Sequence, residues 1–305
     1  MSTGEVPAPD HNPGDARSSV TGSPVGFVGL GNIGGPMAQR LTAWPHGVVV
    51  FDLDDDATAA LAAKGAEVAA SAAEVAQRCG FIGVMVNTEA QVRAVLEDSD
   101  GILAGTGSDA AGTPVVAVHS TISPAGAVGL AAVASGYGVE LLDVAVSGGA
   151  MGAHAGTLAL MVGGDPAAFE TIREPLELMA TVVKYFGPIG AGTTAKVVRN
   201  LITFASYVAV GEASHLAQAA GLDLGALGEV VRHSDSVTGG PGAIMVRDTA
   251  DVMDSDDPLR PIFEHSAALG LKDLELAREL ATSLRVASPI TEIASVNLRS
   301  ALGLD

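Results

Sequence analysis

The chain has 305 residues, enough for two domains that each bury a core, and 48% of them are hydrophobic. Its formal net charge of −19, with only 16 lysines and arginines, argues against a nucleic-acid-binding protein because phosphate contacts need clustered basic residues. A single cysteine, Cys79, excludes a disulfide framework, and the seven histidines never pair at ligand spacing, so no metal site is expected.

The start of the chain gives no sign of export or membrane insertion. Residues 1–23, rich in Gly, Ser, Pro and Asp, predict a disordered leader. They lack the basic and apolar regions of a signal peptide, and no later apolar run reaches the ~18–20 residues of a membrane span. We therefore expect a cytoplasmic protein without membrane or nucleic-acid partners.

The segment VGFVGLGNIGGPMAQR, residues 25–40, carries the strongest local motif. A strand pattern there breaks into Gly29, Gly31 and Gly34 and continues as a helix pattern. In a GxGxxG loop the first glycine permits a tight turn, the second admits a pyrophosphate, and the third lets helix and strand pack closely. The triplet alone would fit an ordinary loop, but its flanking patterns predict a dinucleotide site. The predicted cofactor contacts in this loop are Gly29, Leu30, Gly31, Asn32, Ile33 and Gly34.

Asp52 ends the next strand pattern, VVVFD. A carboxylate at this position accepts hydrogen bonds from both ribose hydroxyls of the adenosine and disfavours the 2′-phosphate of NADP. The sequence therefore predicts NAD as the cofactor, in preference to NADP.

Strand and helix patterns then alternate up to Gly187, which predicts an α/β Rossmann-type domain with a doubly wound, mostly parallel sheet over residues 24–187. The remainder predicts an all-α domain, residues 188–305, for substrate binding and oligomerisation. The predicted strands are 25–30, 47–52, 81–86, 114–118, 139–144, 157–162 and 182–186. The predicted helices are 34–43, 54–64, 89–97, 123–134, one from Pro166, 190–219, 223–232, 240–248, 262–282 and 289–301.

The first helix of the second domain is poor in polar residues. Between Pro188 and Gly211 only Lys196 and Arg199 are charged, which predicts a helix buried on most sides. Lys196 and Asn200, four residues apart, share one face. An apolar setting would lower the pKa of Lys196 and suit it to proton transfer, although a lysine that snorkels to water or pairs with a carboxylate fits the pattern equally.

Two loops that follow strands offer polar groups. Ser147, Gly148 and Gly149 lead into a short Ala-rich helix, where their donors could hold a carboxylate, or form an ordinary Gly-rich turn. Ser120 and Thr121 lie where open α/β sheets bind ligands, but could equally be helix N-caps. On pattern alone, Lys272 is a surface residue of a helix.

Four motifs in one order resemble the β-hydroxyacid dehydrogenase family, and within it the 3-hydroxyisobutyrate dehydrogenases, from Pro24 to the C-terminus. They are GLGNIGGPMAQRL, STISP at Ser120–Pro124, DVAVSGGAMGAHAGTLALMVGG and GAGTTAKVVRN, with LKDLELA following. The resemblance implies the following roles: Lys196 as the catalytic residue; Asn200, Ser120, Ser147, Gly148 and Gly149 as substrate contacts; and Thr121, Lys272, Val86 and Asn87 as cofactor contacts.

Three positions depart from that pattern: Arg199 replaces Asn or His, His119 replaces Asp, and Asn87 replaces Pro. We expect NAD-dependent oxidation of a small 3-hydroxy acid to its semialdehyde by a homodimer or homotetramer. Alternatives are a reductase of tartronate, succinic or glyoxylic semialdehyde, an imine reductase, or a non-catalytic NAD-binding module. The retained Lys196 and Asn200 argue against the last two.

Overall fold

The computed structural model describes residues 20, 22–107 and 114–305. The predicted leader, residues 1–23, lies almost entirely outside them. The chain forms two compact units, Met1–Val198 and Arg199–Asp305, and each is described by itself. No helix in the described part of the chain is long and apolar enough to cross a membrane.

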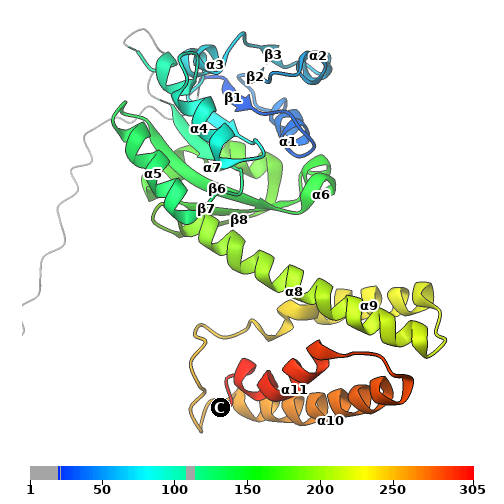
Figure 1. Cartoon of the computed structure of the whole chain (residues 1–305). Helices are drawn as coiled ribbons and strands as arrows, with labels where there is room; N and C mark the ends of the chain where they lie inside the picture. Colours follow the sequence, from blue (N-terminus) through cyan, green and yellow to red (C-terminus); the bar gives the residue numbers. More distant parts are fainter. Residues whose placement is uncertain (1–19, 21, 108–113) are drawn as a thin grey trace, which may run out of the picture. The chain divides into compact units, whose positions relative to one another are not determined.

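The first unit is organised around one eight-stranded sheet with the order β3-β2-β1-β4-β5-β6-β7-β8 (Figure 1). All neighbouring strands are parallel except β6 and β7, which are antiparallel. This confirms the predicted doubly wound, mostly parallel sheet. The strands are β1 (Val25–Val28), β2 (Val48–Phe51), β3 (Glu67–Val68), β4 (Phe81–Val84), β5 (Val115–Val118), β6 (Glu140–Ser147), β7 (Leu158–Gly163) and β8 (Ala180–Gly187).

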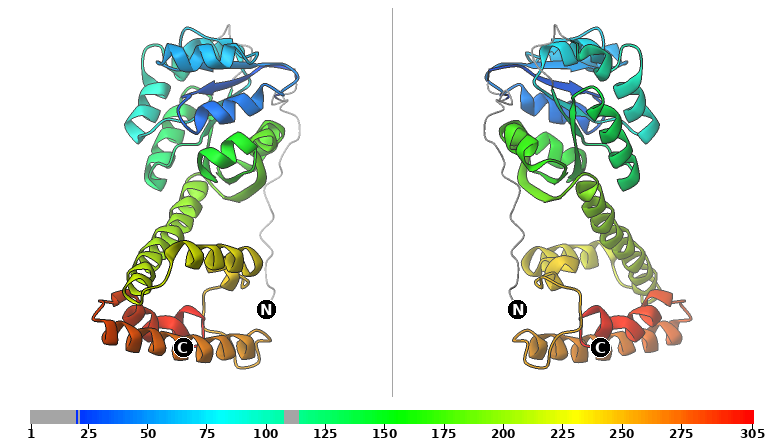
Figure 2. Two further views of the ribbon diagram at one scale, coloured as in Figure 1. Left: turned by 90° about the vertical axis from the view of Figure 1, so that its right-hand side faces the viewer. Right: turned by 90° about the vertical axis from the view of Figure 1, so that its left-hand side faces the viewer.

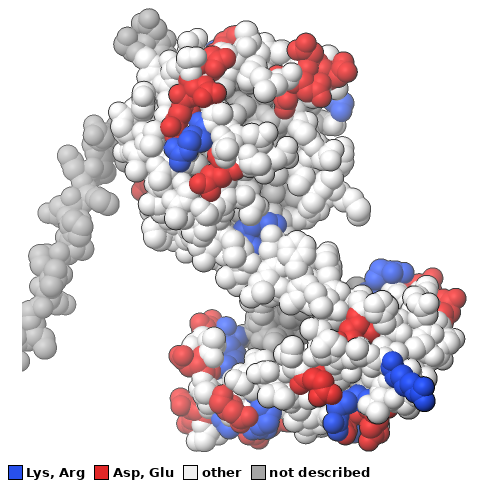
Figure 3. Space-filling view, in the orientation of Figure 1, with Lys and Arg blue, Asp and Glu red and all other residues white. Residues whose placement is uncertain are grey.

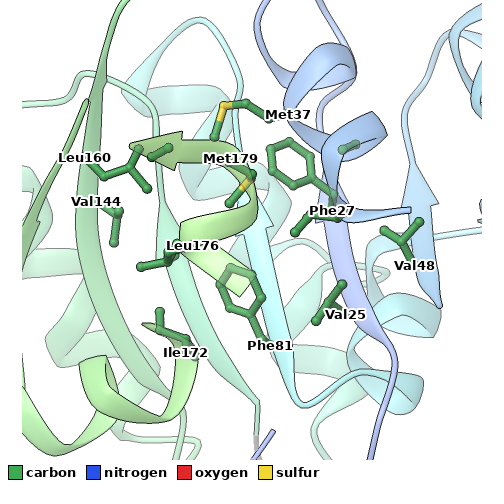
Figure 4. Close-up of a cluster of buried hydrophobic side chains, with 14 of the residues drawn as sticks. Val25, Phe27, Met37, Val48, Phe81, Val144, Leu160, Ile172, Leu176 and Met179 are labelled. Carbon is green, nitrogen blue, oxygen red and sulfur yellow. The ribbon is translucent and has the colours of Figure 1, made fainter. Parts of the chain in front are cut away.

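Helices cover both faces of this sheet because central strands such as β1 and β4 have buried side chains on both of their sides. One core packs α1 and α7 against Phe27, Phe81 and Leu160 (Figure 4), and a second packs α3, α4 and α5 against the other face. Cys79 lies in the second core. The helical segments are α1 (Gly34–Leu41), α2 (Asp55–Ala62), α3 (Ala72–Arg78), α4 (Glu89–Glu97), η1 (Ile102–Gly105), α5 (Pro124–Ser135), α6 (Gly149–Ala155) and α7 (Pro166–Met179).

Helix α8 (Ala191–Ala219) begins in the first unit and continues into the second, which also contains α9 (Leu224–Thr238), η2 (Gly240–Ile244), α10 (Arg260–Leu284) and α11 (Pro289–Ala301) (Figure 2). The predicted helix at 240–248 is only the 3₁₀ turn η2. Gly239, Gly240 and Gly242 explain the difference, since glycine disfavours continued helix and the first two have positive φ.

The prediction that α8 is buried on most sides is wrong for the single chain. Val197, Leu201, Phe204 and Val208 recur at spacings of four, three and four residues, and their exposed fractions are 49%, 69%, 59% and 58%. Val198, Tyr207 and Val210, at other positions around α8, are also about half or more exposed. The spacing of the first four residues places them along one side of the helix. We call these four residues the α8 stripe.

Candidate active site

The three motif glycines take different positions in the turn between β1 and α1. Gly29 has φ 93°, and an added Cβ there would lie 2.2 Å from the carbonyl oxygen of Met85. A Cβ on Gly34 would lie 2.0 Å from the carbonyl oxygen of Gly29, so both residues must be glycine. By contrast, a Cβ on Gly31 would meet no atom within 4 Å. The backbone at Gly31 therefore faces open space, as a close approach by a diphosphate requires.

Asp52, just after β2, is hydrogen-bonded to this loop. Its Oδ2 accepts a short hydrogen bond from the Leu30 N–H, and its Oδ1 accepts the Asp54 N–H at 2.9 Å. A carboxylate offers about four acceptor positions, so both oxygens keep capacity for ribose hydroxyls.

A cavity of about 300 Å³ opens beside this carboxylate. It brings together five of the predicted cofactor residues, Gly29, Gly31, Asp52, Val86 and Asn87. The apolar walls and the single carboxylate fit an adenosine, with the diphosphate over the glycine loop. Leu30, Asn32, Ile33 and Gly34 belong to the loop but do not line the cavity. Sequence reasoning did not identify the other lining residues, which are Val28, Phe51, Leu53, Met85, Gln91, Ala94 and Val95.

Further acidic residues follow Asp52. Asp54 caps α2 by accepting the N–H groups of Asp56 and Ala57, and Asp55 and Asp56 lie in the first turn of that helix. Figure 3 shows these acidic side chains gathered over the α2 end of the first unit. The helix end that would otherwise attract an anion is therefore already occupied by carboxylates.

Ser120 lies just after β5 and connects the loop that follows β5 to the loop that follows β4. Its side chain is 1% exposed, and its Oγ accepts the Val86 N–H at 2.9 Å. Ser123, not Ser120 or Thr121, caps α5 by accepting the Gly126 N–H. Thr121 is exposed beside it. Ser120 thus holds the cofactor-pocket residue Val86 in place, whereas Thr121 remains accessible.

His119 precedes Ser120 and is fully buried. Its Nδ1–H donates to the carbonyl oxygen of Val144 at 2.9 Å, and its ring stacks on Phe27 with centroids 5.8 Å apart. Burial lowers its pKa from 6.5 to about 4, partly opposed by the Val144 hydrogen bond. The ring is therefore neutral near pH 7, and the Val144 contact links the residue that follows β5 to the middle of β6.

The Ser147–Gly149 loop ends β6 and starts α6. Gly148 has φ 128° and Gly149 has φ 60°, and both are exposed. A Cβ on Gly148 would lie 3.0 Å from the Leu158 side chain. The turn therefore needs glycine and presents backbone donors to solvent.

Lys196 lies in the second turn of α8 and is partly buried. The helix starts beside the first turn of α5, since a Cβ on Gly190 would lie 3.2 Å from the Pro124 carbonyl oxygen. Asn200 lies four residues after Lys196 in α8, so both residues are on the same side of the helix.

Among the remaining candidates, Arg199 is exposed on α8, and Lys272 is exposed on α10 and pairs with Asp273 at 3.2 Å. No group of His, Cys, Asp and Glu within the described ranges could hold a metal ion.

The chain matches known proteins along both units. Residues 24–187 match the family model for the NAD binding domain of 6-phosphogluconate dehydrogenase, and residues 190–303 match the model described as NAD-binding of NADP-dependent 3-hydroxyisobutyrate dehydrogenase. An uncharacterized oxidoreductase of Mycobacterium tuberculosis is 46% identical over 280 residues, which cover 92% of this chain and 93% of that protein.

Two further similarities carry a named activity. The NAD-dependent L-serine dehydrogenase of Pseudomonas aeruginosa is 36% identical over 88% of this chain and 89% of its own. A solved structure of Mycobacterium tuberculosis 3-hydroxyisobutyrate dehydrogenase with L-serine superposes with a TM-score of 0.63 at 32% identity, over 90% of this chain and 92% of that one. Fold and pocket together define an NAD(P)-dependent oxidoreductase. The chain belongs to the β-hydroxyacid dehydrogenase family, which confirms the resemblance carried by its four motifs.

Proposed function

We propose that this protein oxidises a small 3-hydroxy acid to its semialdehyde with NAD as the cofactor. The observation that carries the proposal is the cavity lined by Asp52, whose carboxylate also accepts a hydrogen bond from the glycine loop. The same chain has Lys196 near the start of α8. The similarity to an L-serine dehydrogenase supports the substrate class, since serine is itself a 3-hydroxy acid.

In this proposal Lys196 is the general base. A hydroxyl group loses its proton to the lysine amine during oxidation and regains it during reduction. A bound nicotinamide would supply the hydride acceptor for the carbon that bears this hydroxyl. Asn200, on the same side of α8, orients the hydroxyl.

The substrate carboxylate is assigned to Ser147, Gly148 and Gly149. Their hydroxyl and backbone donors end a strand in an exposed turn, and a chain with a net charge of −19 needs such a local attraction for an anion. Ser120 and Thr121 complete the same edge of the sheet, with Thr121 near the nicotinamide ribose. Lys272 is assigned to the cofactor pocket.

NAD is preferred over NADP in this proposal. Asp52 and the three carboxylates that follow it would repel a 2′-phosphate, and Asp54 already caps the α2 N-terminus. The domain boundary is placed after Gly187, between a cofactor domain over 24–187 and a helical domain over 188–305. We further propose a cytoplasmic homodimer or homotetramer in which a second copy covers the α8 stripe.

A substrate panel tests the function directly. Reduction of NAD and NADP is followed by absorbance with 2-, 3- and 4-hydroxy acids, L-serine, and the methyl ester of the best acid. We expect turnover of a 3-hydroxy acid, with a higher kcat/KM for NAD than for NADP. The ester should have at least about a tenfold lower kcat/KM than the acid, because charge-assisted hydrogen bonds contribute roughly 1.5–3 kcal/mol each. Equal turnover of the ester would reassign the substrate to a neutral carbonyl or imine. No NADH from any acid would favour a non-catalytic module.

A further inference from the structure

Asp143 is a buried carboxylate that the proposed chemistry does not use. It lies on β6, level with the end of β5, and is 1% exposed. Its Oδ1 accepts the Gly190 N–H at 2.8 Å, and its Oδ2 accepts the Thr193 N–H at 2.6 Å. Both donors belong to the start of α8, where backbone N–H groups have no partner inside the helix. A side chain 47 to 50 residues away in sequence therefore caps α8.

The surrounding backbone fixes this contact closely. A Cβ on Gly163 of β7 would lie 2.4 Å from Asp143 Oδ1 and 2.7 Å from the Gly192 nitrogen. A Cβ on Gly192 would lie 2.4 Å from the carbonyl oxygens of both Asp143 and Met161. The first turn of α8 thus rests directly on the backbones of β6 and β7, with the carboxylate joined to two of its N–H groups.

Lys196 follows Thr193 by three residues, less than one helical turn. Asp143, Thr193 and Lys196 all belong to the first compact unit. Because the intervening backbone is regular helix, a shift or rotation of the first turn moves the lysine by a similar amount. Catalytic groups must be held within roughly 0.5 Å of productive geometry, and a 1 Å misplacement costs up to about a hundredfold in rate.

We propose that Asp143 is the positioning residue for Lys196: its carboxylate fixes the first turn of α8 on the sheet and thereby sets where the lysine amine lies. This inference rests on the proposed role of Lys196 as the base. The carboxylate also places a negative charge at the positive end of the helix, which favours the same arrangement.

Asp143→Asn is the sharpest variant, because the amide keeps the shape and one acceptor oxygen but faces the second N–H with its own NH₂ group. In hydrogen exchange, we expect the amides of residues 190–196 to exchange at least about tenfold faster, with β1 and β4 unchanged. In steady-state kinetics, we expect kcat to fall about 10- to 100-fold, while the NADH dissociation constant and the KM for NAD stay within about twofold. Unchanged exchange in residues 190–196 would overturn the proposal.

Glu212→Gln is the matched control on the same helix. Glu212 accepts the N–H groups of Ile290 and Thr291 at 2.7 and 2.8 Å and so caps α11 as Asp143 caps α8. Glu212→Gln should lower the stability of the folded chain and leave kcat within about twofold of the native value. An equal fall in kcat would assign the effect to general loosening of α8 and contradict a positioning role. If Asp143→Asn does not fold, Asp143→Ser retains one smaller acceptor and is measured in the same way.

A double-mutant cycle separates positioning from an independent effect. If Asp143 acts through Lys196, adding Asp143→Asn to Lys196→Ala changes the residual kcat by less than about twofold. A further loss as large as in the native background would overturn the proposal. Failure of the proposed function gives a different result from failure of the positioning role. If Lys196 is not the base, Lys196→Ala alone leaves kcat unchanged. If Lys196→Ala lowers kcat strongly but Asp143→Asn does not, only the positioning role is rejected.

Discussion

Asp52 combines two tasks at the end of β2: it holds the glycine loop through the Leu30 N–H and faces the cavity proposed for the adenosine. We expect kcat/KM to favour NAD over NADP by at least about tenfold, or ~1.4 kcal/mol. Asp52→Ser should narrow that ratio, because it removes one charge facing a 2′-phosphate. Kinetics with both cofactors measure this, and equal efficiency in the unaltered protein would contradict the assignment.

His119 makes the stability of the fold depend on pH. Its pKa is about 4 in the folded chain against an ordinary value of 6.5, so the unfolded state takes up a proton first as the pH falls. The stability from the neutral ring is complete above pH 6.5 and is lost progressively between pH 6.5 and 4, by about 3 kcal/mol in total.

His119→Gln tests this dependence, since glutamine can still donate to Val144 but does not titrate in this range. Urea unfolding between pH 7.5 and 4.5 should show a smaller loss of stability in the variant than in the native chain. Identical pH slopes would mean that His119 does not contribute the effect.

The residues that sequence reasoning identified share a local signature, and those it missed do not. Gly29, Gly31 and Asp52 stand at fixed positions relative to two strand patterns, so their meeting in one cavity was predictable. Asp143 has no sequence signal of its own beyond its place in a motif, because its partners Gly190 and Thr193 lie far away in sequence. Gln91, Ala94 and Val95 share a face of α4, but only the sheet order shows that this face meets the cavity.

The start of α8 has no room for a side chain at Gly192. In Gly192→Ala the new Cβ would meet two carbonyl oxygens at 2.4 Å, so the helix or the strands must shift. We expect a loss of about 1–3 kcal/mol in denaturant unfolding and a lower kcat.

Gly211→Ala provides the opposite control on the same helix. A Cβ at Gly211 would meet no atom within 4 Å, and alanine favours a helix over glycine by roughly 0.8–1 kcal/mol. This variant should therefore be slightly more stable than the native chain. Similar destabilisation of both variants would show that the loss in Gly192→Ala does not come from the contact with β6 and β7, because Gly211 has no such contact.

The elements that the sequence did not predict lack a strong periodic signal. Strand β3 has only two residues, both exposed, and α3 follows in an Ala-rich stretch without a clear apolar face. In contrast, α4 was predicted with its observed bounds. In the structure Thr88 and Gln91 form a capping box at its start, and Val92 and Leu96, four residues apart, are buried.

The α8 stripe predicts self-association of the chain. Four apolar side chains along one side of a helix, each about half or more exposed, are better covered by a second copy than left in water. We expect sedimentation to give a multiple of the 30.4 kDa chain mass. Leu201→Asp should shift the protein toward monomer.

Tyr137→Asp is the control for that experiment, because Tyr137 is 58% exposed in the first unit and lies outside the stripe. It should leave the oligomer intact. A native protein that sediments as a monomer at micromolar concentration would contradict a role of the stripe in self-association.

Lys196→Ala, assayed with the best acid from the panel, decides whether Lys196 moves the proton in the proposed hydroxyacid oxidation. We expect kcat to fall by about 10² to 10⁴ while NADH affinity stays within a few-fold, because the cavity at Asp52 does not include the lysine. Near-normal turnover in this variant would rule out Lys196 as the base.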